Sequence, residues 1–391
     1  MLGKGFWDFL KRGVYLNQKG VELRELSEKT LVLRIVLSLV IGLALLVLIL
    51  FIFKNKLIFF PTSGMNLTPA STGWEFEDVY IESGDGKKIN GWYLPGPPDG
   101  NQLTVLLLHG NGGNMEQMLG RIMTYHKLDY GILAVDYQGF GRSEGSPSEE
   151  ATYQDALAAW DFLTQTKGIK PQNIIIHGFS LGGGVATYLA QQKKEFHNPL
   201  ILDSTFTKLR DAPAELNPII AVLSRIILGN AYDSISRLKD IEAGVLLVFH
   251  SQRDEVVPYK LGRELFDAYD GGPKFFYELQ GYHMEYTFNQ GTYADAIYKH
   301  LSQMRPLVLE TPEETGDPER VVPGSPLDEL LNRPPRPPAA GPVNGEAPNQ
   351  DQAPTQDQAQ DQAPTQAQDQ APDQAQDQEP LPNGVPGQSG P

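Results

Sequence analysis

The chain has 391 residues, no cysteine and a formal net charge of −16. The lack of cysteine excludes disulfides, thiolate nucleophiles and cysteine-ligated zinc. The acidic balance argues against nucleic acid as a partner, because there is no basic stripe to neutralise phosphates.

A long apolar segment, "LVLRIVLSLVIGLALLVLILFIF" at 31–53, predicts one transmembrane helix. A cleavable signal peptide is the alternative, but the polar leader at 1–30 is long and no A-x-A-like site follows. Lysine and arginine are more frequent before the segment than after it, so the positive-inside bias predicts a cytoplasmic N-terminus and an extracytoplasmic location for the large domain that follows. The opposite orientation remains open if the leader's acidic residues alter insertion.

After a linker at 54–74, residues 75–305 read as one α/β domain, in which short apolar runs alternate with helical patterns. We expect a mostly parallel eight-stranded sheet with helices on both faces. The first two strands should form a hairpin through Asp85-Gly86. The predicted strands are 77–82, 88–94, 104–109, 132–136, 173–177, 200–203, 245–250 and 274–278, and the predicted helices are 115–127, 149–166, 181–193, 259–269 and 293–304.

The C-terminal segment, 306–391, is rich in proline, glutamine, alanine and aspartate. It carries 15 acidic and 3 basic residues, so most of the net charge belongs to it. Because it holds too few apolar residues to offset the entropy of ordering, we expect a disordered tail.

One serine stands between glycines where a strand-like run gives way to a helix-like pattern: Gly178, Phe179, Ser180, Leu181 and Gly182 spell G-x-S-x-G. In such an elbow the strained turn exposes the hydroxyl, and the glycines avoid collisions with neighbouring backbone. The alternative without a catalytic role is a glycine-rich turn in which the serine is incidental. The flanking strand and helix favour a nucleophile.

A serine nucleophile needs a base and a group that orients the base. Downstream, Asp254 follows the strand at 245–250, and His283 follows the strand at 274–278. Asp203, at the end of another strand, is a competing acid. The oxyanion needs main-chain donors, for which we expect the N–H groups of Leu181 and Asn111, the latter in "HGNGGN".

Together these segments resemble the α/β-hydrolase superfamily, and within it the abhydrolase-domain-containing serine hydrolases anchored by one N-terminal span. The motifs that carry the resemblance are "FFPT", "HGNGGN", "DYQGFGRSEGSPSEE", "GFSLGGG", "RDEVVP" and "GYHMEY". The resemblance implies an α/β-hydrolase fold in which Ser180 is the nucleophile, Asp254 the acid and His283 the base. Gln138 stands where the family normally has arginine, which removes a charge that we expect near the site entrance.

The sequence therefore predicts a membrane-anchored serine esterase or thioesterase that uses no metal or organic cofactor. Its expected substrates are acyl esters or thioesters, including lipid or acyl-protein esters, and the sequence does not indicate which protein partners the chain has. A serine peptidase or acyltransferase of the same fold, or a non-catalytic tethered binding module, are the alternatives. The apolar stretch "NPIIAVLSRIILGNAY" at 217–232 could form a small lid, rest against lipid or pack in the core.

Overall fold

The computed structural model describes residues 12–17, 20–25, 28–96, 103–193, 196–215 and 217–301. The predicted disordered tail at 306–391 lies outside them. Near the N-terminus, β1 (Arg12–Asn17) and β2 (Gly20–Glu25) form an antiparallel hairpin that precedes the helix α2 (Glu28–Ile52). Among the described helices, only the one at 29–52 is long and apolar enough to cross a membrane, and its most apolar window is 0% buried. A core helix of a soluble domain would be covered on at least one face.

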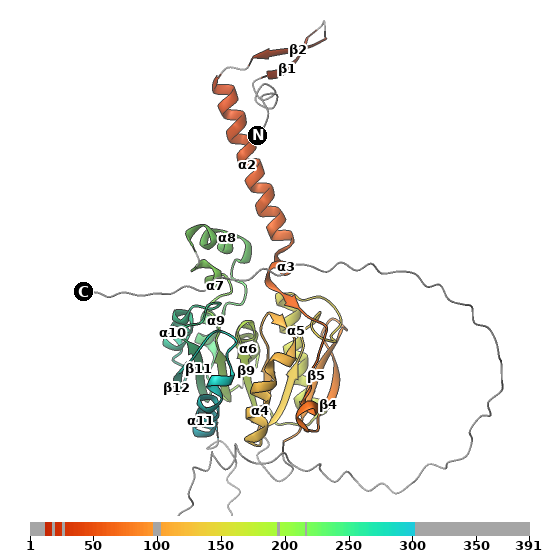
Figure 1. The fold of residues 1–391 in the computed structure, drawn as a ribbon, viewed down its shortest axis with the longest axis vertical. Helices are drawn as coiled ribbons and strands as arrows, with labels where there is room; N and C mark the ends of the chain where they lie inside the picture. The colour runs from red at the N-terminus through yellow and green to blue at the C-terminus, as the bar shows by residue number, and fades with distance from the viewer. Residues whose placement is uncertain are drawn as a thin grey trace, which may run out of the picture. The chain divides into compact units, whose positions relative to one another are not determined.

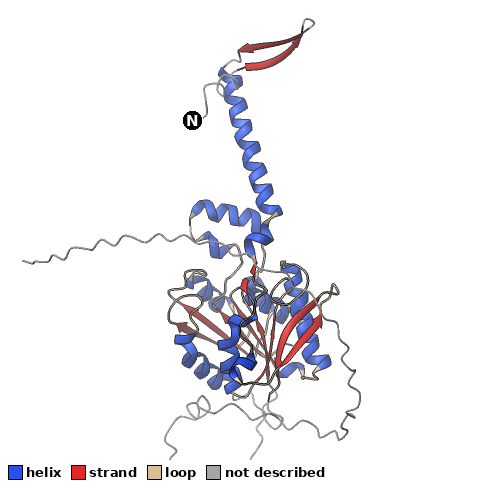
Figure 2. Ribbon diagram, turned by 45° about the vertical axis from the view of Figure 1, so that its right-hand side comes forward, coloured by secondary structure: helices blue, strands red, loops and turns tan. Residues whose placement is uncertain are grey.

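The centre of the α/β domain is one eight-stranded sheet with the order β12-β11-β10-β9-β6-β8-β5-β4 (Figures 1 and 2). Within this sheet, β5 runs antiparallel to both of its neighbours, β4 and β8. The six strands from β12 to β8 run parallel to one another. The strands are β4 (Glu77–Glu82), β5 (Lys88–Leu94), β6 (Thr104–Leu108), β8 (Gly131–Val135), β9 (Ile174–Phe179), β10 (Pro199–Asp203), β11 (Val245–Ser251) and β12 (Lys274–Leu279). This confirms the predicted fold class, and every predicted strand boundary is met within two residues.

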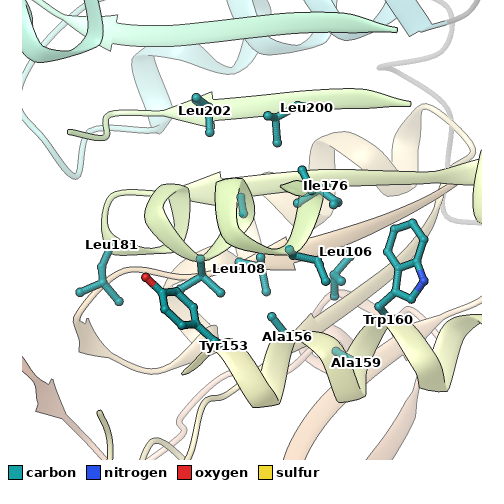
Figure 3. Packing of buried hydrophobic residues seen from close by; sticks show 14 of the residues in the cluster. Leu106, Leu108, Tyr153, Ala156, Ala159, Trp160, Ile176, Leu181, Leu200 and Leu202 are labelled. Carbon is teal, nitrogen blue, oxygen red and sulfur yellow. The ribbon is translucent and has the colours of Figure 1, made fainter. Parts of the chain in front are cut away.

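The central strands are buried on both faces, which explains their continuous apolar sequences. Alternate residues of β6 enter different cores: Leu106 and Leu108 pack on one side of the sheet, Val105 and Leu107 on the other. Figure 3 shows the first core, where side chains of the sheet meet the helix α5 (Glu149–Asp161).

Five helices cover the sheet. The first core includes residues of α5, α6 (Leu181–Gln192) and α10 (Tyr259–Ala268), and the second includes α4 (Leu119–Lys127) and α11 (Gln290–Leu301). The helix predicted at 149–166 ends its regular α turns at Asp161 and continues as a π turn over Phe162–Thr166. The helix predicted at 293–304 begins earlier, at Gln290, and residue 304 lies outside the described part of the chain.

Further short elements gather around the carboxyl ends of the parallel strands (Figure 1). They are α3 (Lys54–Ile58), β3 (Phe60–Pro61), β7 (Gly112–Gly113), α7 (Asp211–Ala214), α8 (Pro218–Leu228) and α9 (Ser234–Arg237). Single 3₁₀ turns occur at various places in the domain and cover Pro69–Thr72, Met115–Met118, Pro171–Asn173, Leu238–Asp240 and Thr287–Asn289. The segment treated above as a linker therefore contains secondary structure that contributes to the site.

Candidate active site

Ser180 lies in the tight turn between β9 and α6, and its backbone is strained. Its φ of 53° and ψ of −119° lie in a region that side-chain-bearing residues rarely adopt. The two flanking glycines are required by close backbone contacts: a Cβ on Gly178 would meet the Gly182 carbonyl oxygen at 2.2 Å, and one on Gly182 would meet that of Leu108 at 2.1 Å. The G-x-S-x-G spacing thus follows from the packing of this turn.

Three side chains from separate loops meet at this turn. His283, in the loop after β12, has Nε2 at 3.0 Å from the Ser180 hydroxyl. Its Nδ1 lies 2.7 Å from Oδ2 of Asp254, which follows β11. Because an ionised carboxylate can only accept, Nδ1 carries the proton and Nε2 is left to accept the proton of the serine hydroxyl. This is the hydrogen-bonded arrangement that activates a nucleophilic serine.

The Asp254 carboxylate is held in its ionised form. Burial raises its pKa, but hydrogen bonds from His250 and His283 outweigh burial and lower the pKa to about 2. The other oxygen, Oδ1, accepts the N–H groups of Val256 and Val257 at 3.0 and 2.7 Å. A neighbouring carboxylate, Glu255, accepts the main-chain N–H of His283 at 2.9 Å, so both side chains fix the histidine loop.

Asp203, the competing acid, is engaged elsewhere. Its carboxylate forms a buried ion pair with Arg121 at 2.6 Å and lies 3.4 Å from Nε2 of His177. Burial raises the pKa of Asp203, but the charge of Arg121 outweighs it, so the pKa lies below its ordinary value. Its main-chain oxygen accepts the N–H of Ser180 at 2.8 Å. Asp203 therefore supports the backbone of the turn, and Asp254 contacts the imidazole.

A cavity of about 570 Å³ opens beside Ser180, within the range of about 300–1,000 Å³ that is usual for ligand sites. Asn111 and Leu181, the two expected oxyanion residues, both line it. Most of the remaining wall is apolar and comes from several loops and short helices: Leu57, Ile58, Phe206, Leu209, Ala212, Pro213, Leu228, Val256, Val257 and Pro258, with Glu215 and Glu255 as carboxylates.

The loop that carries Asn111 is fastened to the segment that follows α2, a connection that sequence reasoning missed. The two-residue strand β3 pairs in parallel with β7, and the Asn111 side-chain amide donates to the carbonyl of Ile58 at 2.7 Å. From the other side, Asp136 accepts the N–H of Met115 at 2.6 Å. The motif "FFPT" marked this segment by resemblance, but nothing in its composition indicated its pairing partner.

Gln138 does not lie where we expected it. Its amide donates to Asp155 at 3.1 Å and to Asp85 at 3.2 Å, and it is absent from the described residues that line the cavity. The exchange of arginine for glutamine therefore affects the buried Asp155 rather than the site entrance. Within the described ranges, no group of three or more histidine, aspartate or glutamate side chains could hold a metal ion.

Comparisons with known proteins agree with this architecture. A family model described as the alpha/beta hydrolase fold matches residues 104–269. The chain is 34% identical over 215 residues to an uncharacterized protein of Mycobacterium tuberculosis strain H37Rv, covering 55% of this chain and 75% of the relative. It is 30% identical over 236 residues to the alpha/beta hydrolase domain-containing protein WAV2 of Arabidopsis thaliana, covering 56% of this chain and 75% of the relative.

Among solved structures, an esterase of Pyrococcus furiosus superposes with a TM-score of 0.52 at 21% identity. The match covers 63% of this chain and 99% of the esterase. At 21% identity, the likeness to this esterase shows a shared fold alone.

Proposed function

Because this chain belongs to the α/β-hydrolase family, we propose that it is a membrane-anchored serine hydrolase that cleaves carboxylic esters or thioesters. The observation that carries the proposal is the hydrogen-bonded chain from Ser180 through His283 to Asp254. A scaffold without catalytic activity has no physical need for a strained serine, an oriented imidazole and an ionised acid in one place.

The proposed reaction proceeds through an acyl-enzyme. His283 takes the hydroxyl proton of Ser180 as the serine oxygen bonds to the carbonyl carbon, and it then delivers that proton to the departing alcohol or thiol. Asp254 keeps Nδ1 protonated and stabilises the imidazolium while it exists. Water then enters and gives a proton to His283 as its oxygen bonds to the acyl carbon. The bond from that carbon to the Ser180 oxygen breaks, His283 returns the proton to the serine oxygen, and the acid leaves.

The tetrahedral intermediate carries negative charge on the former carbonyl oxygen. We propose the main-chain N–H groups of Leu181 and Asn111 as its donors, since both residues line the cavity beside Ser180. Loss of one such donor costs about 2.7–4 kcal/mol of transition-state stabilisation in a hydrolase with a comparable site. The apolar wall favours an acyl chain over a polar group on the acid side of the substrate.

For the membrane, we propose that α2 remains as an anchor, with the N-terminus cytoplasmic and the catalytic domain outside. In this proposal, residues 1–30 are a cytoplasmic leader, residues 31–53 are the transmembrane span and residues 306–391 are a disordered tail. The contacts of Ile58, Phe60 and Pro61 with the Asn111 loop support a catalytic unit that starts near Lys54 rather than at residue 75.

Fluorophosphonate labelling of the full chain tests the catalytic proposal. The wild-type protein should be labelled, and Ser180→Ala should not. Folded wild type that resists the probe, or a Ser180→Ala variant that still reacts, would refute the assignment. A graded series of acyl esters, thioesters and amides then defines the reaction, and faster cleavage of amides would identify a peptidase. Protease accessibility on intact cells reports the orientation.

A further inference from the structure

The helix α8 presents an apolar stripe to solvent. Ile219, Val222 and Ile226 are spaced by three and four residues, so they lie on one face of the helix. Their exposed fractions are 73%, 55% and 54%. Ser224, on another face, is buried. Contiguous exposed apolar surface of this kind marks a site of contact with a membrane or a partner.

This stripe lies close to the end of the proposed membrane span. The helix α8 contacts α2 directly, and both figures that show the whole fold draw α8 beside α3, where α2 meets the domain (Figures 1 and 2). From Ile52, the last residue of α2, to Leu57 in the cavity wall there are five residues, which span at most about 18 Å even when extended. Leu228, at the end of α8, lines the same cavity. If α2 crosses a bilayer, the bilayer surface lies beside the cavity.

Cationic side chains accompany the apolar surface. Lys54 and Lys56 follow the span directly, with Nζ 5.1 Å from the ring centre of Phe51 and 5.6 Å from that of Phe53. Arg225 is exposed on α8, next to Ile226. Lysine and arginine beside aromatic and aliphatic side chains suit the headgroup region, where phosphates meet acyl chains. Apolar surface and charge thus point to the same occupant.

We propose that α8 docks on the bilayer that α2 crosses, with Ile219, Val222 and Ile226 inserted at the boundary of headgroups and acyl chains. The cavity beside Ser180 then opens at the lipid surface, and its substrate is an acyl ester drawn from that same membrane. This inference rests on the proposed function through its membrane anchor. It adds a second membrane contact and a source for the substrate.

Site-specific labelling tests the docking in the full chain reconstituted into vesicles. Because the chain has no cysteine, Val222→Cys, Leu43→Cys in α2 and Tyr80→Cys on β4 each give a single site for an environment-sensitive dye. Tyr80, 54% exposed, is the matched control for Val222. Nitroxide-bearing phospholipids should quench the dye at positions 43 and 222 at least twofold more than at position 80.

Each outcome of the labelling has a definite meaning. Quenching at 43 with none at 222 overturns the docking while leaving the anchor intact. No quenching at 43 overturns the anchor and the docking together. A dye at 222 that is shielded from water but not quenched by lipid identifies a second copy or another protein as the occupant, and this also overturns the inference.

An activity measurement tests the source of the substrate. The triple variant Ile219→Gln, Val222→Gln, Ile226→Gln changes only side chains outside the cavity wall. It should hydrolyse p-nitrophenyl palmitate in vesicles at least tenfold more slowly than wild type, with unchanged turnover of soluble p-nitrophenyl acetate. The inference is overturned if the triple variant matches wild type on both esters, or if it loses the same fraction of wild-type activity on both. If wild type cleaves neither ester, the proposed function fails, and the labelling still decides the docking.

Discussion

Replacement of Gly182 by alanine should damage catalysis through a displacement that the structure defines. The added Cβ would lie 2.1 Å from the carbonyl oxygen of Leu108 and 2.7 Å from that of His109. Both contacts are to backbone, which no side-chain rotation can relieve. Since Cβ atoms do not approach such atoms closer than about 3 Å, the first turn of α6 must move by about 1 Å relative to β6.

That first turn carries the groups that the reaction needs. Ser180 precedes it, and Leu181, the proposed oxyanion donor, begins it. A misplacement of about 1 Å at a reacting group costs roughly 10²-fold in rate, which corresponds to about 2.7 kcal/mol. Overpacking should also lower the free energy of unfolding by about 1–3 kcal/mol. We therefore expect Gly182→Ala to fold, with a lower melting temperature and about 1% of the wild-type kcat.

The assay compares turnover of a soluble short-chain ester with thermal unfolding, after fluorophosphonate titration of active sites. Gly291→Ala is the matched control, because Gly291 also lies in the first turn of a helix and a Cβ there would meet nothing within 4 Å. Its activity should equal that of wild type, and its stability should be equal or higher by up to about 1 kcal/mol. A Gly182→Ala variant with wild-type kcat would refute the reasoning.

Three further substitutions and one change of pH test the groups around the turn. Asp254→Asn should lower kcat by about 10⁴-fold, because the asparagine side chain no longer holds the imidazole in the required tautomer. Glu255→Gln can still accept the N–H of His283 and should lower kcat by less than about tenfold. Similar losses of kcat for the two variants in steady-state assays would contradict the triad. Arg121→Met should destabilise the protein by about 3–5 kcal/mol, because it leaves Asp203 buried without its partner, and an unchanged melting temperature would contradict this. The pKa of Asp254 falls from 3.8 to about 2 on folding, so its ionisation contributes about 2 kcal/mol, which is present above about pH 5 and is lost as pH falls through 4 toward 2. The difference in melting temperature between wild type and Asp254→Asn should therefore shrink between about pH 5 and pH 2, and a difference that stays constant over that range would contradict this reasoning.

The sheet could be predicted because its information is local. Runs such as "NIIIH" and "GVLLVF" are buried on both faces, and glycine, aspartate or proline marks their ends. The elbow around Ser180 was equally visible, because the G-x-S-x-G pattern and the steric limit at Gly178, which involves the Gly182 backbone, lie within five residues, although the limit at Gly182 comes from Leu108 on β6. Local constraints of this kind leave a signature in one sequence.

The order of residues along the chain favoured Asp254 over Asp203 as the acid, but the contacts that separate the two aspartates are distant in sequence. Both aspartates follow apolar strands, so their local patterns are alike. What separates them is Arg121, which reaches Asp203 across 82 positions, and His283, which reaches Asp254 across 29. The pairing of β3 with β7 was hidden for the same reason, since two-residue strands have no periodicity to detect.

The segment that directly follows the proposed anchor is part of the candidate active site. Leu57 and Ile58 form cavity wall, and the carbonyl of Ile58 holds the side chain of Asn111, whose main chain is a proposed oxyanion donor. If α2 is the anchor that we propose, the segment after it sets the height of the site above the membrane, and its contact with Asn111 also shapes the proposed oxyanion loop. A flexible tether of equal length in place of this segment could hold the site at the same height, but it could not hold the Asn111 loop in its shape.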